Sequence, residues 1–156
     1  FEEYNGSNAH VFQKAVSIGV DILYRHCLKN SLNVVLDGTF AHRRVEENIQ
    51  RSLDLERSVE IHFVYQEPKI AWSFTQKREM IEHRRITKEV FIKTFLGARD
   101  NVNMVKRQFG DRIILNLFIK DVTNLRVEKE FIDIKREIDS YLGRIYNYQH
   151  LNKIIK

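Results

Sequence analysis

Apolar residues recur every three to five positions through most of the chain. This is the period of an amphipathic helix, because residues at that spacing lie on one helix face. Thr87 is a suitable capping residue, Ser7 or Asn8 could cap the first helix, and proline is favoured in a first turn, as at Pro68. The pattern predicts five helices: residues 9–28, 43–55, 68–82, 88–109 and 127–148.

Three shorter segments have the pattern of strands. Residues 32–36 form a continuous apolar run, typical of a strand that is buried on both faces. Apolar residues alternate over 59–65, and residues 112–120 follow a break at Gly110 and Asp111. The alternation of helices and strands predicts an α/β fold. We expect three layers (αβα), in which a mostly parallel sheet lies between two layers of helices.

The number of predicted strands is small for this architecture. Sheets usually contain about four to six strands, and this sequence begins with a helix. We therefore expect that an opening strand–loop–helix unit is missing from the N-terminal side. Residues 1–156 are expected to form a single domain, with residues 122–156 as a C-terminal helical extension.

Composition narrows the class of protein. Charged residues make up 30% and hydrophobic residues 43% of the 156 positions, which is typical of a globular domain. The single cysteine, Cys27, cannot form an internal disulfide, which favours a reducing, cytoplasmic location. No apolar stretch approaches the ~18–20 residues of a membrane span, so no membrane partner is expected.

The net charge of +5 favours anionic partners such as phosphates and nucleotides. Acidic residues are interleaved with the basic ones throughout the chain. A basic surface that simply faces solvent is therefore the simpler interpretation, and nucleic acid is an unlikely partner.

Asp37, Gly38 and Thr39 directly follow the apolar run at 32–36. In open α/β sheets, ligands bind at the carboxyl ends of the strands. Asp37 could there bind a substrate hydroxyl or a metal, with Thr39 as a second polar contact. The alternative is that Asp37 and Gly38 only form the turn that leaves the strand.

Two further features could contribute to a site. Arg78 and Arg85 are seven residues apart, so they would share a face if the helix continued. Arginine binds phosphate oxygens in a bidentate manner, although arginines at a helix end also complement the helix dipole. Asp21 lies among apolar residues of the first helix, where a carboxylate needs solvent, a partner or a cleft.

Several kinds of site are not indicated. No G-x-x-x-x-G-K-[ST] phosphate loop is present in the sequence. The six histidines are scattered and there is one cysteine, so no metal site is expected.

Four segments of the chain resemble the zeta toxin family, small P-loop kinases of bacterial toxin–antitoxin systems. The resemblance covers about residues 1–121. In the last segment, the family's R-x-V-P-x-E-V pattern is matched with Thr87 in place of the proline. The four segments, in the family's order, are residues 4–9, 33–39, 67–70 and 84–90.

The resemblance implies a P-loop-kinase-like fold that uses ATP and Mg²⁺. Family members with an assigned activity phosphorylate a hydroxyl of UDP-N-acetylglucosamine, and an antitoxin protein is an implied partner. Asp37, Thr39 and Asp21 match the family's substrate-binding positions. Arg78 matches the first of two phosphate-contacting arginines, and the second is Arg84, with Arg85 close enough to compete.

The family's phosphate loop and catalytic base precede the segment matched by residues 4–9. They are therefore expected before Phe1, and the chain alone is expected to hold ATP and Mg²⁺ poorly and to be inactive. Two alternatives stay open: a non-catalytic interaction domain derived from such a kinase and, less favoured, a nucleic-acid-binding domain.

Overall fold

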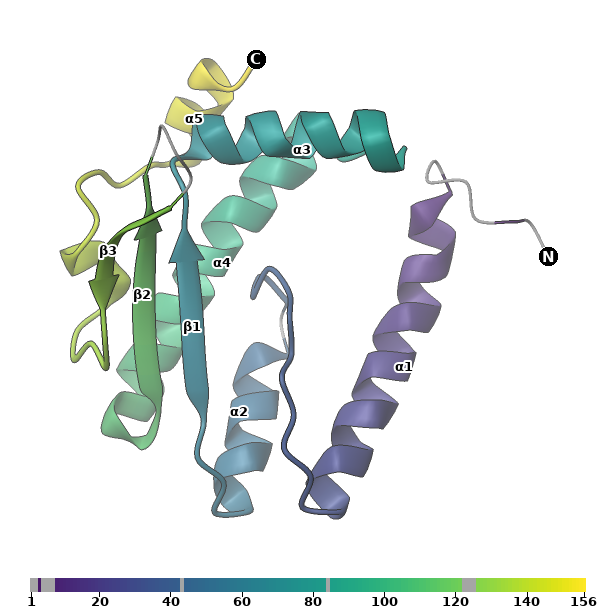
Figure 1. The fold of residues 1–156 in the computed structure, drawn as a ribbon, viewed down its shortest axis with the longest axis vertical. Coiled ribbons are helices and arrows are strands. Elements are labelled where there is room, and N and C mark those ends of the chain that lie inside the picture. Colours follow the sequence, from purple (N-terminus) through teal and green to yellow (C-terminus); the bar gives the residue numbers. More distant parts are fainter. Residues whose placement is uncertain (1–2, 4–7, 43, 84, 122–125) are drawn as a thin grey trace. The chain divides into compact units, whose positions relative to one another are not determined.

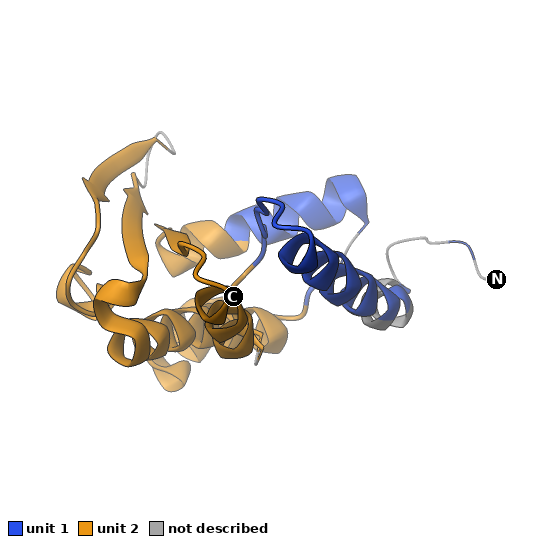
Figure 2. Ribbon diagram, turned by 90° about the horizontal axis from the view of Figure 1, so that it is seen from below, with its two compact units in different colours: residues 1–38, 73–86 blue, residues 39–72, 87–156 orange. Residues whose placement is uncertain are grey.

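The computed structural model describes residues 3, 8–42, 44–83, 85–121 and 126–156. Contacts between Cα atoms divide the chain into two compact units (Figure 2). Unit 1 contains residues 1–38 and 73–86, and unit 2 contains residues 39–72 and 87–156. Helix α3 (Pro68–Glu82) begins in unit 2 and ends in unit 1.

Unit 1 is built mainly from α1 (Ala9–Lys29), which confirms the first predicted helix. Asn8 occupies the capping position, but its side chain makes no capping hydrogen bond, and Ser7 lies outside the described residues. Several apolar side chains of α1 are exposed, among them Val16, Ile22 and Leu23. Across the described chain, no helix is both long enough and apolar enough to cross a membrane.

The predicted strand at residues 32–36 is wrong. Residues 32–37 have no regular secondary structure, and Val35 is 94% exposed. A strand requires a neighbour for its backbone N–H and C=O groups. The described sheet has the order β1-β2-β3 and does not contain this segment, so the apolar run alone was insufficient to predict a strand.

The sheet of unit 2 contains β1 (Glu60–Tyr65), β2 (Ile114–Lys120) and β3 (Val127–Phe131) (Figure 1). β1 and β2 are parallel, with Ile61 opposite Leu115, which confirms the two predicted strands in these regions. β2 and β3 are antiparallel. The sheet is therefore mixed rather than mostly parallel, within an α/β structure.

Three further predicted helices are confirmed. They are α2 (Val45–Asp54), α3 and α4 (Lys88–Phe109). Pro68 is the first residue of α3, as its missing N–H allows. Thr87 caps α4, because its Oγ1 accepts a hydrogen bond from the Val90 backbone N–H at 3.3 Å.

The predicted helix at 127–148, and with it the helical extension at 122–156, is wrong for residues 126–147. This region contains β3 and the short 3₁₀ helix η2 (Ile138–Ser140), and only α5 (Tyr148–Ile154) is α-helical. β3 pairs with the edge of β2, and Asp133 has a positive φ of 47°, which interrupts any helix. The helical spacing arose because Ile134 and Ile138 nevertheless belong to the core.

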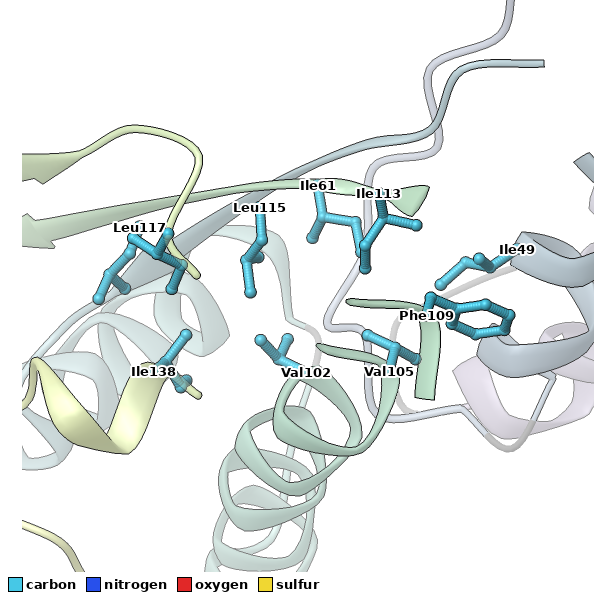
Figure 3. Packing of buried hydrophobic residues seen from close by; sticks show 10 residues of the cluster. Ile49, Ile61, Val102, Val105, Phe109, Ile113, Leu115, Leu117 and Ile138 are labelled. Carbon is cyan, nitrogen blue, oxygen red and sulfur yellow. The ribbon is translucent and has the colours of Figure 1, made fainter. Parts of the chain in front are cut away.

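The main core lies on one face of the sheet. Ile61, Leu115 and Leu117 of the sheet pack against α4 through Val102 and Val105, and Ile49 of α2 joins the same cluster (Figure 3). The opposite face carries His62 and Val64, both more than half exposed, and His62 stacks on Phe118 at 5.6 Å between ring centroids. The second helical layer of the expected three-layer arrangement therefore stays a prediction.

Truncation of Leu115 to Ala is expected to destabilise the protein by about 2–5 kcal/mol, because its fully buried side chain would leave a cavity. Val35→Ala should change the free energy of unfolding by less than about 0.5 kcal/mol, because Val35 is exposed. Urea denaturation of both variants measures the two values. A similar loss for both would show that residues 32–36 are buried after all.

Candidate functional site

Asp37, Gly38 and Thr39 are all exposed and lie outside helices and strands. Asp37 belongs to unit 1 and Thr39 to unit 2, because the boundary falls after Gly38. Within the described chain, the Asp37 carboxylate has no hydrogen bond or ion pair. It is therefore available to accept hydrogen bonds from a ligand.

The chain that follows Thr39 is attached to α4. Phe40 has a positive φ of 59°, which is unusual for a residue with a side chain. The Asn101 side chain donates a hydrogen bond to the Phe40 carbonyl oxygen at 2.8 Å. The conformation of this loop is thus held by α4.

Asp21 and Arg25 form an ion pair of 2.9 Å on α1. The Asp21 side chain is 19% exposed and that of Arg25 is 61% exposed. A carboxylate among apolar residues needs solvent, a partner or a cleft. For Asp21, the structure shows a charged partner, Arg25, one helical turn away.

The arginines of the expected phosphate site are paired with nearby carboxylates. Arg78 donates two hydrogen bonds to Glu82, at 3.2 and 3.1 Å, and these bonds raise the pKa of its guanidinium. Arg85 Nε lies 3.8 Å from Glu79 Oε1, and Arg84 lies outside the described residues. Because α3 ends at Glu82 and His83 has a positive φ of 55°, Arg78 and Arg85 do not share one continuous helix.

A second polar group lies at the carboxyl end of β1, in unit 2. The Tyr146 hydroxyl donates a short hydrogen bond of 2.5 Å to Glu67 Oε1. Arg99 Nη1 donates to the backbone oxygen of Tyr146 at 2.8 Å. Burial raises the pKa of the Tyr65 hydroxyl, and the negative charge of Glu67 raises it further. This end of a parallel strand is where ligands bind in α/β folds.

Gln66, between the strand and Glu67, has a buried Nε2 atom without a hydrogen-bond acceptor among the described residues. Most buried polar atoms in folded proteins are hydrogen-bonded. The Gln66 amide therefore lacks an acceptor among the described residues that such a donor usually has.

Sequence reasoning did not identify Asn101, Arg99 or Tyr146. Asn101 carried one signal, because asparagine is a poor residue for a helix interior and often has a side-chain role there. Tyr146 and Arg99 are brought to β1 only by tertiary structure, so no local pattern could have found them.

The described residues contain no group of three or more His, Cys, Asp or Glu side chains that could hold a metal ion. The sequence also lacks a phosphate loop.

The comparison with protein families is decisive. The sequence model of the family described as Zeta toxin matches residues 1–136. The chain belongs to the zeta toxin family. This confirms the resemblance, and the match extends beyond β3. No curated protein and no solved structure gives a significant match.

Membership of the zeta toxin family indicates a kinase-like toxin domain. The matched region contains every candidate residue named from the sequence. It ends before Tyr146, so the hydrogen bond from Tyr146 to Glu67 involves a segment outside the family match.

Replacement of Asn101 by Ala should destabilise the protein by about 1–3 kcal/mol, because the Phe40 carbonyl loses its hydrogen bond. Amide hydrogen exchange of residues 39–42 should accelerate as the loop loosens. Asn152→Ala, an exposed change on α5, is the matched control. Unchanged exchange in Asn101→Ala would show that α4 does not hold this loop.

Stability should fall at alkaline pH. The pKa values of Tyr65 and Tyr146 are raised in the folded protein, so folding favours their neutral forms. Their contribution is complete below the unfolded pKa of about 10 and decreases as pH rises above it. Urea denaturation between about pH 8 and pH 11 measures this decrease.

The Tyr65→Phe variant should lose less stability over this pH range than the wild type, whereas Tyr148→Phe, which changes an exposed side chain of α5, should behave like the wild type. Equal pH dependence in all three proteins would contradict the assignment to Tyr65.

Proposed function

We propose that this chain forms the acceptor-binding and lid portion of an ATP-dependent kinase with a P-loop-kinase-like fold. The acceptor is a hydroxyl of a nucleotide sugar such as UDP-N-acetylglucosamine. The family match over residues 1–136 carries this proposal, because it spans the positions of both the acceptor residues and the arginines.

Asp37, Asp21 and Thr39 bind the acceptor in this proposal. Carboxylates accept hydrogen bonds from sugar hydroxyls, and the Asp37 carboxylate is exposed and unpaired in the described chain. Asp21 is held in place by Arg25 at 2.9 Å. The loop after Thr39 is held to α4 by Asn101, which supports a defined position for the threonine.

The lid arginines bind phosphate groups. Arg78 is paired with Glu82, but both side chains are exposed, at 63% and 47%. Exposed ion pairs contribute little to stability, so a phosphate can replace Glu82 at small cost. Arg84 or Arg85 is the second arginine of the pair.

ATP and Mg²⁺ are the cofactors that family kinases would use. The sequence contains no phosphate loop, and the described residues contain no cluster of side chains that could hold a metal ion. We expect this chain alone to bind ATP weakly. An antitoxin protein is a further proposed partner.

A non-catalytic interaction domain is the second candidate. The exposed apolar side chains Val16, Ile22 and Leu23 on α1 favour it, because large exposed apolar patches often mark sites of protein contact. An interaction domain requires no nucleotide-sugar binding, which is what separates it from the kinase proposal.

Binding of UDP-N-acetylglucosamine to the chain, measured by isothermal titration calorimetry, tests the acceptor site. Asp37→Asn should weaken binding about tenfold or more, because a hydrogen bond to a charged group contributes about 1.5–3 kcal/mol. Asp54→Asn, an exposed carboxylate on α2, should have no effect. Absence of binding, or equal weakening by both variants, would contradict the acceptor assignment.

The arginines are tested by phosphoryl transfer in the natural protein that contains this sequence. Arg78→Ala and Arg84→Ala should each reduce turnover by about 10²-fold, as for other groups that stabilise developing charge. Arg51→Ala is the matched control, because Arg51 also pairs with a carboxylate four residues away, Glu47. Unchanged turnover in both lid variants would disprove the lid assignment.

A further inference from the structure

A hollow lies in unit 2, between α4 and residues 135–140. Its volume is about 460 Å³. One wall is formed by Lys106 and Arg107 near the end of α4, and the other by residues 135–137 with Asp139 and Ser140. Small-molecule sites in proteins typically have volumes of about 300–1,000 Å³, so the hollow has a suitable size.

The two walls are joined by one buried hydrogen bond and one exposed ion pair. The backbone N–H of Ile138 donates to Asn103 Oδ1 at 2.9 Å, and both residues are buried. Arg107 Nη1 lies 2.6 Å from Glu137 Oε2. Because these contacts already exist in the structure described here, a ligand would not have to order this wall when it binds.

The lining contains four basic side chains and two acidic ones. Two of the basic groups are already paired: Arg107 with Glu137, and Lys135 with Asp133 at 2.7 Å. The other two basic side chains of the lining, Lys106 and Arg136, have no carboxylate partner in the described part of unit 2. The hollow therefore has an excess of positive charge.

Lys106 is 4% exposed, and its Nζ donates to the Gly110 carbonyl oxygen at 3.0 Å. An ammonium group has three donors, and a buried charge is costly unless it is compensated. Basic residues in the last turn of α4 also complement the helix dipole. That effect accounts for Lys106 and Arg107 but not for Arg136 and Ser140 on the opposite wall.

The hollow also offers an acceptor. The Asp139 side chain lines it and is 33% exposed, while the buried Oδ1 atom lies 3.9 Å from Arg99 Nε. The exposed part of this carboxylate can accept a hydrogen bond from a ligand hydroxyl. The lining thus combines cationic donors with one carboxylate acceptor.

We propose that this hollow binds a phosphate monoester of a small polyhydroxylated molecule. Lys106, Arg136 and the Ser140 hydroxyl bind the phosphate oxygens, and Asp139 accepts a hydrogen bond from a hydroxyl of the ligand. Nucleic acid fits less well, because Glu137 and Asp139 would repel a continuous phosphate backbone.

None of the side chains that line the hollow belongs to the proposed acceptor site of Asp21, Asp37 and Thr39. Lys135 Nζ lies 3.2 Å from Asp111, and the Ile134 N–H bonds to the Leu115 carbonyl at 2.8 Å. These contacts place one wall beside the amino end of β2. Tyr65 and Glu67 lie at the carboxyl end of β1, which runs parallel to β2. The inference therefore does not depend on the proposed kinase function.

Titration of the ¹⁵N-labelled chain with glucose 6-phosphate, and separately with inorganic phosphate, tests the proposal by NMR. Amide shifts should concentrate at residues 103–107 and 135–140. Glucose 6-phosphate should bind at least about fivefold more tightly than inorganic phosphate, because only the sugar supplies a donor for Asp139. Arg136→Gln should weaken binding of both probes about tenfold.

Lys129→Gln is the matched control, because it removes an exposed cation on β3 that does not line the hollow. It should change both affinities by less than about twofold. Equal weakening by the two variants would show diffuse charge attraction and overturn the site. Equal affinities for the two probes would overturn the hydroxyl contact to Asp139. Tighter binding of an RNA oligonucleotide to the same amides would overturn the small-molecule assignment.

Discussion

The burial of β2 between two neighbouring strands and α4 is the constraint on which unit 2 depends. Leu115 and Leu117 on β2, and Val102 and Val105 on α4, have no exposed surface. Each buried aliphatic side chain contributes about 1.5–3 kcal/mol relative to exposure, so this contact sets both the register of the strands and the position of α4. The packing of β2 against α4 therefore determines where the loops of unit 2 lie.

Polar contacts attach the loop after Thr39, η2 and the C-terminal segment to α4. Asn101 holds the loop after Thr39, Asn103 holds η2, and Arg99 holds the chain at Tyr146. All three are polar residues within a helix whose apolar stripe forms the core. One helix therefore positions the loop of the proposed acceptor site, the wall of the basic hollow and the C-terminal segment.

The family and the structure contribute different parts of the functional argument. The match over residues 1–136 establishes the zeta toxin family and a kinase-like toxin domain. The structure shows that Asp37 is exposed and that Arg78 is paired with Glu82 through two exposed side chains. It also shows a cationic hollow beside the amino end of β2, which no motif in the sequence indicated.

Local sequence determined most helices and two strands, because helix periodicity, the Thr87 cap and the break at Gly110 act within a few residues. The family resemblance was also determined by sequence alone. Tertiary structure decided the rest. Residues 32–36 are apolar but have no strand neighbour, and residues 127–131 have helical spacing but pair with β2. Pairing between strands depends on distant partners, which a local pattern does not contain.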